Sequence, residues 1–234
     1  MAFLEIKNLS KKYNGQVVLD NVSYSFPSKG LFVLLGESGV GKSTFINCLA
    51  GIEKMDKGTI LFNNQKIKNF EKFRNKYVGM IYQNSNLISF LSVIDNACLL
   101  TNKTKENLID LSKFKNRKVN VLSGGENQRV AIARALSSSS KILLCDEPCG
   151  SLDKQNSMMI LKILTELSKR SLVIMVTHNF ELVKKFNPYI IKIENKQIVG
   201  SYYKDENNRF FSEKLRFLSI TKIIKIAYRT LTNN

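Results

Sequence analysis

A glycine-rich loop between an expected strand and an expected helix constrains this fold more than any other feature. The apolar run 31–35 is too short for a helix and is bounded by glycines, which predicts a strand buried on both faces. The loop 36–43, with the sequence GESGVGKS, fits the pattern G-x-x-x-x-G-K-[ST] in full. Residues 43–50 then place apolar side chains at helical spacing. Such a strand–loop–helix unit is typical of α/β folds.

The loop predicts a site for nucleotide phosphates. Its glycines let backbone N–H groups turn inward around phosphate oxygens, and the helix behind it adds the positive end of its dipole. Lys42 can reach the β- and γ-phosphates, and the Ser43 hydroxyl can ligate Mg²⁺. The expected phosphate-binding residues are Gly36, Ser38, Gly39, Gly41, Lys42, Ser43 and Thr44.

Further segments extend the α/β pattern. Two more apolar runs, 142–145 and 172–176, predict buried strands, and the periodic segments 126–136 and 158–167 before them predict helices. Strands alternating with helices indicate a largely parallel sheet. The first stretch, from residue 3 to 19, alternates instead like antiparallel strands, and segment 93–114 predicts a small helical insert.

Two adjacent carboxylates, Asp146 and Glu147, follow the second apolar run. A carboxylate at the end of a buried strand can hold Mg²⁺ through water, and a neighbouring one can accept a proton from an attacking water. Adjacent carboxylates are common on protein surfaces, so the pair indicates a catalytic site only in combination with the phosphate loop.

The charge of the chain leaves the partner open. With 36 Lys and Arg against 19 Asp and Glu, the 234 residues carry a net charge of +17, which suggests a polyanionic neighbour, either nucleic acid or an anionic membrane face. No apolar run approaches the roughly 18 residues that a membrane span needs. Four scattered cysteines are too few for a disulfide framework, so we expect buried thiols in a reducing compartment.

A third motif connects these features with a known family. Residues 122–129 read LSGGENQR, stand about twenty residues before Asp146, and resemble the signature motif of ATP-binding-cassette ATPases. The resemblance implies a P-loop NTPase with a RecA-like, mostly parallel α/β core, an N-terminal antiparallel β subdomain and a small helical subdomain at about 84–135. It implies a nucleotide-binding domain at 1–204, followed by a basic tail at 205–234.

Four other positions match the family pattern. Tyr13 matches the aromatic residue that stacks on adenine, a role we favour over that of an ordinary strand tyrosine. Gln83 matches the glutamine that contacts Mg²⁺ and senses the transporter. Asp153 lies in the loop that crosses to the partner subunit, or is simply a helix N-cap. His178 matches the switch histidine that contacts the γ-phosphate.

The resemblance implies a mechanism that needs two chains. Two nucleotide domains would pack head-to-tail as a homodimer, with each ATP between one phosphate loop and the Ser123, Gly124 and Gly125 segment of the other chain. Glu147 would activate water, while Gln83, His178, Lys42 and Mg²⁺ stabilise the developing charge. The expected Mg²⁺ ligands are Ser43, Gln83 and Asp146. A membrane permease, separate or fused C-terminally, would be the partner at the cytoplasmic face of the membrane.

Within the family, the motifs resemble the branch that serves lipoprotein-releasing, macrolide and antimicrobial-peptide exporters. Two departures stand out: only 39 residues, 84–122, separate Gln83 from Ser123, and the tail carries apolar residues at helical spacing from 217 to 231. Such a tail suits a membrane surface, a partner groove or packing on its own domain. Segment 226–231 resembles the stretch before the first membrane span in fused ATPase–permease chains.

Two alternatives compete with the transporter interpretation. A soluble ABC ATPase acting on nucleic acid or ribosomes would also use the positive charge. Those relatives usually carry two cassettes, coiled-coil insertions or zinc modules, and this sequence shows one phosphate loop and no such additions, so no nucleic-acid partner is expected. A catalytically idle binding module is disfavoured by the complete set of motifs, including Glu147.

Overall fold

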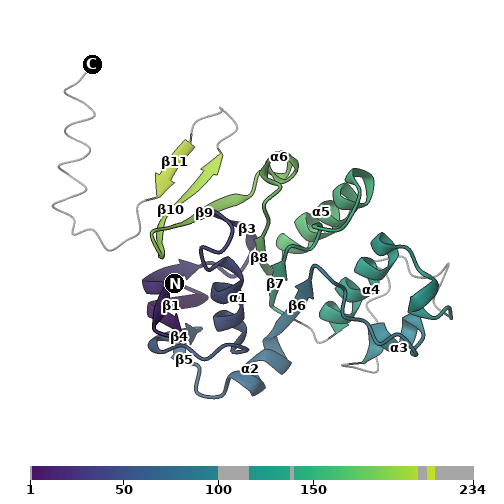
Figure 1. The fold of residues 1–234 in the computed structure, drawn as a ribbon, viewed down its shortest axis with the longest axis horizontal. Helices are drawn as coiled ribbons and strands as arrows, with labels where there is room; N and C mark the ends of the chain where they lie inside the picture. Colours follow the sequence, from purple (N-terminus) through teal and green to yellow (C-terminus); the bar gives the residue numbers. More distant parts are fainter. Residues whose placement is uncertain (1, 100–115, 138–139, 205–209, 214–234) are drawn as a thin grey trace.

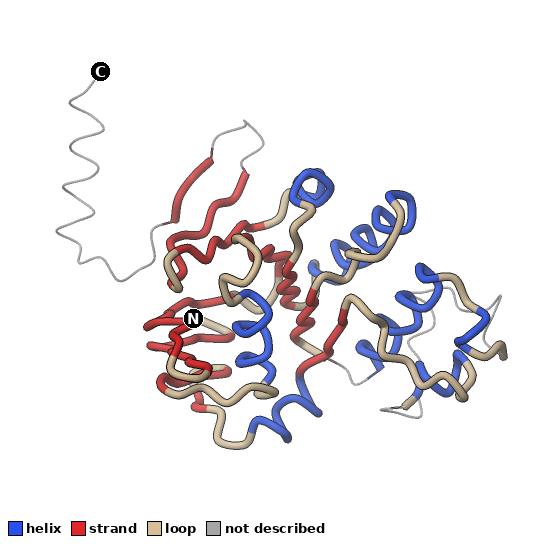
Figure 2. Tube along the Cα trace, in the orientation of Figure 1, coloured by secondary structure: helices blue, strands red, loops and turns tan. Residues whose placement is uncertain are grey.

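The computed structural model describes residues 2–99, 116–137, 140–204 and 210–213, which form two sheets with helices around them (Figures 1 and 2). The smaller sheet is antiparallel, in the order β2-β1-β4-β5. Its strands are β1 (Leu4–Tyr13), β2 (Gln16–Phe26), β4 (Lys57–Phe62) and β5 (Gln65–Lys66). Asn14 and Gly15, both at positive φ, form the two-residue turn between β1 and β2, as an Asn-Gly pair commonly does. The predicted antiparallel start of the chain is therefore confirmed.

The larger sheet has the order β11-β10-β9-β3-β8-β7-β6. Its strands are β3 (Gly30–Leu35), β6 (Val78–Tyr82), β7 (Ile142–Asp146), β8 (Leu172–Val176), β9 (Tyr189–Glu194), β10 (Gln197–Lys204) and β11 (Phe210–Glu213). From β6 to β9 all neighbours are parallel, whereas β10 and β11 add on antiparallel. The three predicted buried strands are β3, β7 and β8, and the predicted fold class is confirmed.

Helices cover both faces of the larger sheet. They are α1 (Lys42–Ala50), α2 (Phe70–Tyr77), α3 (Val93–Cys98), α4 (Gly124–Ser137), α5 (Lys154–Ser168) and α6 (Phe180–Val183), with 3₁₀ turns η2 (Val119–Val121) and η3 (Lys184–Phe186). One apolar core lies between the two sheets and includes α1, and the other lies under α4 and α5. Strand β3 contributes Phe32 and Leu34 to the first core and Leu31 and Val33 to the second, because successive side chains of a strand point to opposite faces.

Some expectations differ from the structure or lie beyond it. Helix α5 begins at Lys154, four residues before the expected helix, because Asp153 caps it. Of the expected insert 93–114, α3 accounts for the first six residues, and the part after residue 99 lies outside the described residues, as does the expected helix at 217–231. The domain boundary after residue 204 stays a prediction, although β11 pairs with β10 beyond it. Among the helices in the described ranges, none has the length and apolar character to cross a membrane.

Candidate functional site

The phosphate loop connects β3 to α1 and curls around the side chain of Lys42. Its ammonium group donates hydrogen bonds to the carbonyl oxygens of Gly36 (2.8 Å) and Glu37 (2.7 Å). Gly41 has a φ of 103°, and a Cβ there would lie 2.9 Å from a methyl group of Val18. The loop therefore needs glycine at Gly41 for its backbone conformation and for its close approach to β2. This geometry places the charge of Lys42 within the curve of the loop.

Ser43, at the start of α1, and Asp146, at the end of β7, meet across the sheet edge. The Ser43 hydroxyl donates to Oδ1 of Asp146 at 3.0 Å. Burial raises the pKa of Asp146, while this hydrogen bond opposes the rise. A hydroxyl and a carboxylate that converge in this way are the oxygen donors that Mg²⁺ prefers, so these residues fit the ion implied by the family.

Glu147 and His178 form a second pair beside the first. Nδ1 of His178 lies 3.0 Å from Oε1 of Glu147, and the His178 side chain is 72% exposed. Glu147 has a φ of 49°, in the left-handed region that costs a residue with a Cβ some strain, and its N–H donates to the carbonyl of Val176. Its Oε2 is buried and has no hydrogen-bond partner in the described part of the chain. A buried carboxylate oxygen left free in this way can accept a proton from a bound water.

Gln83 follows β6 and lies against the turn after Glu147. Its side-chain nitrogen would be 2.9 Å from a Cβ at Gly150, so any larger residue there would displace it. A cavity of about 280 Å³ opens beside it, lined by Ser43, Tyr82, Gln83, Asn84, Asn86, Asp146 and Glu147. The structure thus brings Gln83 together with both carboxylates, because the parallel strands β6, β7, β8 and β3 end at the same sheet edge.

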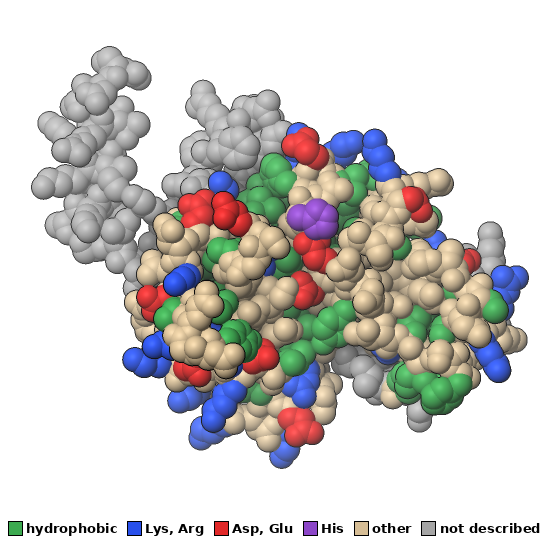
Figure 3. Space-filling view, viewed as in Figure 1, with side chains coloured by type: hydrophobic (Ala, Val, Ile, Leu, Met, Phe, Trp, Pro, Cys, Tyr) green, Lys and Arg blue, Asp and Glu red, His purple; other side chains and the backbone are tan. Residues whose placement is uncertain are grey.

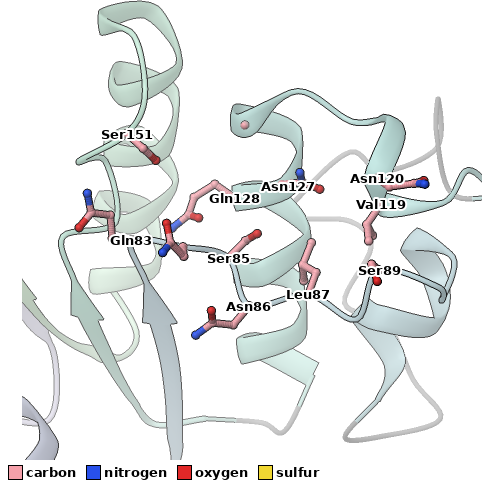
Figure 4. A pocket seen from close by; sticks show the side chains of 12 residues that line it. Gln83, Ser85, Asn86, Leu87, Ser89, Val119, Asn120, Asn127, Gln128 and Ser151 are labelled. Carbon is pink, nitrogen blue, oxygen red and sulfur yellow. The ribbon is translucent and has the colours of Figure 1, made fainter.

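Two side chains that are not among the expected site residues hold the segment around Gln83, and Figure 4 shows one of them, Gln128, beside this segment. Gln128, which is buried, donates from Nε2 to the carbonyl of Tyr82 at 2.9 Å. The guanidinium of Arg134 donates to the carbonyls of Ser85 (2.9 Å) and Asn86 (2.8 Å). Both side chains come from α4, so this helix binds the chain on either side of Gln83. Their place within and just after the LSGGENQR segment was the one available signal.

Asn96 of α3 fixes the next part of this segment. Its buried side chain accepts from the N–H of Ile88 and donates to the carbonyls of Ile88 and Ser92. Because a buried amide needs these bonds, Asn96 holds the turn in one conformation. No residue pattern in the chain would have identified Asn96.

Tyr13, at the end of β1, lies near the phosphate loop. Burial raises the pKa of Tyr13, and the interaction of its side chain with the Thr44 hydroxyl opposes this rise. The ring is partly exposed, and the ammonium of Lys11 lies 4.6 Å from its centroid. This position is compatible with a nucleobase beside the loop. Tyr13 is also an ordinary strand residue, since it ends β1 and pairs with Gln16 of β2.

The Ser123–Gly125 segment begins α4 and has the form of a capping box. Ser123 donates from its N–H (2.8 Å) and its hydroxyl (2.9 Å) to Oε2 of Glu126, and the N–H of Glu126 donates back to the hydroxyl. The bond from the Ser123 backbone is the largest cause of the lowered pKa of Glu126. Figure 1 shows α4 and α1 on opposite sides of β6 and β7, so one chain does not bring this segment to its own phosphate loop.

Asp153 is the N-cap of α5. Its carboxylate accepts from the backbone N–H of Asn156 at 2.9 Å and from the Asn156 side chain at 2.6 Å. A Cβ at Gly125 would overlap the Asn156 side-chain oxygen, so the start of α4 packs closely on this cap. The capping role is therefore present in the single chain, and the role across a dimer interface stays a prediction.

Most of the expected site residues lie together on one face of the molecule. Figure 3 shows the single histidine of the chain beside acidic side chains near the centre of the face, with Lys and Arg side chains distributed toward its edges. Thus Lys42, Ser43, Gln83, Asp146, Glu147 and His178 lie together, and Tyr13 lies at the rim beside Thr44. The cysteines Cys48 and Cys145 are buried, and none of the four forms a disulfide.

Known proteins resemble the chain in sequence and in fold. A family model described as ABC transporter matches residues 19–150. The chain is 32% identical to a phosphonates import ATP-binding protein of Treponema denticola, over 93% of this chain and 96% of that protein. It is 35% identical to a lipoprotein-releasing system ATP-binding protein of Buchnera aphidicola, over 82% and 94% respectively. A dimeric structure of the ATP-binding cassette MJ0796, in a post-hydrolysis state with ADP and Pi, matches with a TM-score of 0.74 at 28% identity, over 85% of this chain and 97% of that one.

Proposed function

Since the chain belongs to the ABC transporter family and is an ATP-hydrolysing subunit or domain of such a transporter, we propose roles for the residues at the sheet edge. The observation that carries the proposal is the convergence of Ser43, Asp146, Glu147 and His178 at the carboxyl ends of the parallel strands. Lys42 and the loop backbone hold the ATP phosphates. Tyr13 stacks on the adenine ring.

Ser43, Gln83 and Asp146 are the proposed ligands of Mg²⁺, directly or through water. When bound, the ion would neutralise charge on the phosphates. The 3.0 Å hydrogen bond between Ser43 and Asp146 supports this assignment, because it brings two oxygen donors to one point. Burial raises the pKa of Asp146, so the carboxylate gains from a cation that replaces lost solvation.

Glu147 is the proposed general base for the attacking water. Its free buried Oε2 can take the proton, while Oε1 faces His178. Two backbone bonds fix the residue: its N–H donates to Val176, and its carbonyl accepts from Gly150. His178, which is largely exposed, can turn toward the γ-phosphate and stabilise the charge of the transferring group.

A head-to-tail dimer would complete the site, with Ser123, Gly124 and Gly125 of one chain on the ATP of the other. Two observations support this: the segment lies far from the phosphate loop of its own chain, and the related cassette above is dimeric with ADP and Pi. The dimer would drive a membrane permease, which places the chain at the membrane periphery.

Mixing two inactive variants tests the head-to-tail arrangement. Lys42→Ala removes the phosphate ligand, and Ser123→Arg blocks the opposite face. In a mixed head-to-tail dimer both defects fall in one site and the other site is intact, so mixing should restore ATP hydrolysis that neither variant has alone. A mixture as inactive as its components, in spite of mixed dimers detected by a tag, would argue against this packing.

The relatives support ATP hydrolysis more strongly than they support one direction of transport. Relatives of similar identity serve phosphonates import and lipoprotein release, so the exporter branch stays a prediction. Co-purification of the full chain with its membrane fraction would identify the permease, and flux in vesicles would give the direction. Retention on ribosomes or nucleic acid instead would favour the soluble alternative, which the relatives do not favour.

A further inference from the structure

Lys11, near the end of β1, is buried although it carries a charge. It is 9% exposed and is the one buried Lys, Arg, Asp or Glu in the described ranges. Its ammonium pairs with Oε2 of Glu53 at 3.1 Å and donates to the carbonyl of Lys54 at 3.0 Å. Since a buried cation is costly unless paired, these two bonds fix the ammonium in place.

The segment that carries Glu53 is itself bound to β1. The N–H of Lys12 donates to the carboxylate of Asp56 at 2.6 Å, and the N–H of Asp56 donates to the carbonyl of Ser10 at 3.0 Å. The chain after α1 is therefore attached to the strand on either side of Lys11. These backbone hydrogen bonds hold Glu53 near Lys11, so the ion pair between the two side chains keeps the ammonium in one position.

The ammonium lies over one face of the Tyr13 ring, 4.6 Å from the ring centroid. A cation at this distance is attracted by the negative face of an aromatic ring. The ring is nevertheless 39% exposed, so surface not covered by Lys11 is open to a ligand. One face of the ring is thus covered by the Lys11 ammonium, so a planar group that stacks on the ring would take the opposite face.

We infer that Lys11 is a positioning residue for the nucleobase: it holds the Tyr13 ring so that the open face receives the adenine. The inference rests on the stacking role proposed above for Tyr13. A ring that is already held loses less freedom when the base stacks on it, which increases affinity without a new contact. The charge itself is paired with Glu53, so it adds little to the attraction of the phosphates, which Lys42 faces.

Two ligands separate a role at the base from a role at the phosphates. ADP carries both groups and pyrophosphate carries the phosphates alone. For Lys11→Met we expect the affinity for ADP to fall about three- to tenfold, the range of a cation–π contact, while the affinity for pyrophosphate is unchanged. Lys12→Met is the matched control, because Lys12 is the exposed neighbour and loses the same charge. Lys11→Arg should retain most of the ADP affinity.

Three outcomes with the Lys11→Met substitution would overturn the inference. One is an equal fall in affinity for both ligands, and another is an ADP affinity no lower than that of Lys12→Met. In a Tyr13→Leu background, Lys11→Met should add no further loss, and an additional loss there is the third. If Tyr13→Leu itself binds ADP normally, the stacking role fails and the inference with it. If only Tyr13→Leu weakens ADP, the inference alone fails. Should Lys11→Met not fold, Lys11→Gln, which also removes the charge over the Tyr13 ring, takes its place with the same expected losses.

Discussion

Nδ1 of His178 lies 3.0 Å from Oε1 of Glu147, and the two residues follow the adjacent parallel strands β8 and β7. One carboxylate oxygen of Glu147 is thereby oriented, and the other is left buried and free. The pair has the geometry of a base with an orienting partner. Because the phosphates are assigned to Lys42 and its loop, a substitution of Glu147 should affect hydrolysis and not nucleotide binding.

Glu147→Gln should bind ATP and dimerise on it but hydrolyse it about 10²- to 10⁴-fold more slowly, because an amide cannot take the proton. Phosphate release gives the rate, and size-exclusion chromatography with ATP gives the dimer. Glu166→Gln, on the exposed side of α5, is the charge-matched control and should turn over normally. Near-normal turnover by Glu147→Gln would rule out the general-base role.

Arg134→Ala should lower the free energy of unfolding by about 1–3 kcal/mol, since the carbonyls of Ser85 and Asn86 lose bonds to a charged donor. It should also reduce the turnover number more than the ATP affinity, because Gln83 loses its support. Urea unfolding and steady-state kinetics measure the two effects. Arg170→Ala, at an exposed position after α5, should change neither. A variant with wild-type turnover would show that Gln83 does not depend on this anchor.

Glu126 should make stability depend on pH. Its pKa is lowered, chiefly by the hydrogen bond from the Ser123 backbone, so the ionised form is favoured in the folded chain. Its contribution is present above the ordinary value of 4.5 and is lost as the pH falls through the lowered pKa. Glu126→Gln should thus be less stable than the wild type at pH 7, and the difference should shrink below pH 4.5 in urea unfolding. A difference that is constant over this range would contradict the assignment.

Gly79→Ala should destabilise the fold by about 1–3 kcal/mol through overpacking. A Cβ at Gly79 would lie 2.6 Å from the carbonyl oxygen of Ala135 and 2.9 Å from a methyl group of Leu143. Since β6 approaches the backbone of α4 here, α4 would have to move away and take Gln128 with it. Thermal unfolding measures the loss. An unchanged midpoint would mean that α4 adjusts without cost.

The regular elements were largely predictable because their signal is local. The runs 31–35, 142–145 and 172–176 could only be buried strands, and each is one. The apolar periodicity at 158–167 places the start of α5 four residues too late, whereas the reading of Asp153 as an N-cap places it correctly, at Lys154. The segments outside the described residues, including the tail, stay predictions.

The site was predictable where a side chain acts through its own chemistry. Ser43, Asp146, Glu147 and His178 were expected from the motifs, and the structure brings them together. Gln128 and Asn96 were not expected, because they act on backbone carbonyls and N–H groups whose positions depend on how α3 and α4 pack. No residue pattern records that information.

The attachment of Gln83 to α4 has a consequence for a pair of sites. Gln128 and Arg134 of α4 donate hydrogen bonds to the backbone before and after Gln83. Helix α4 begins directly after Ser123. In the proposed head-to-tail dimer, a displacement of Gln83 at one nucleotide would move α4 and with it the Ser123 segment, which would contact the other nucleotide. The two nucleotide sites of such a dimer would then be coupled, because a change at one site would alter the surface that completes the other.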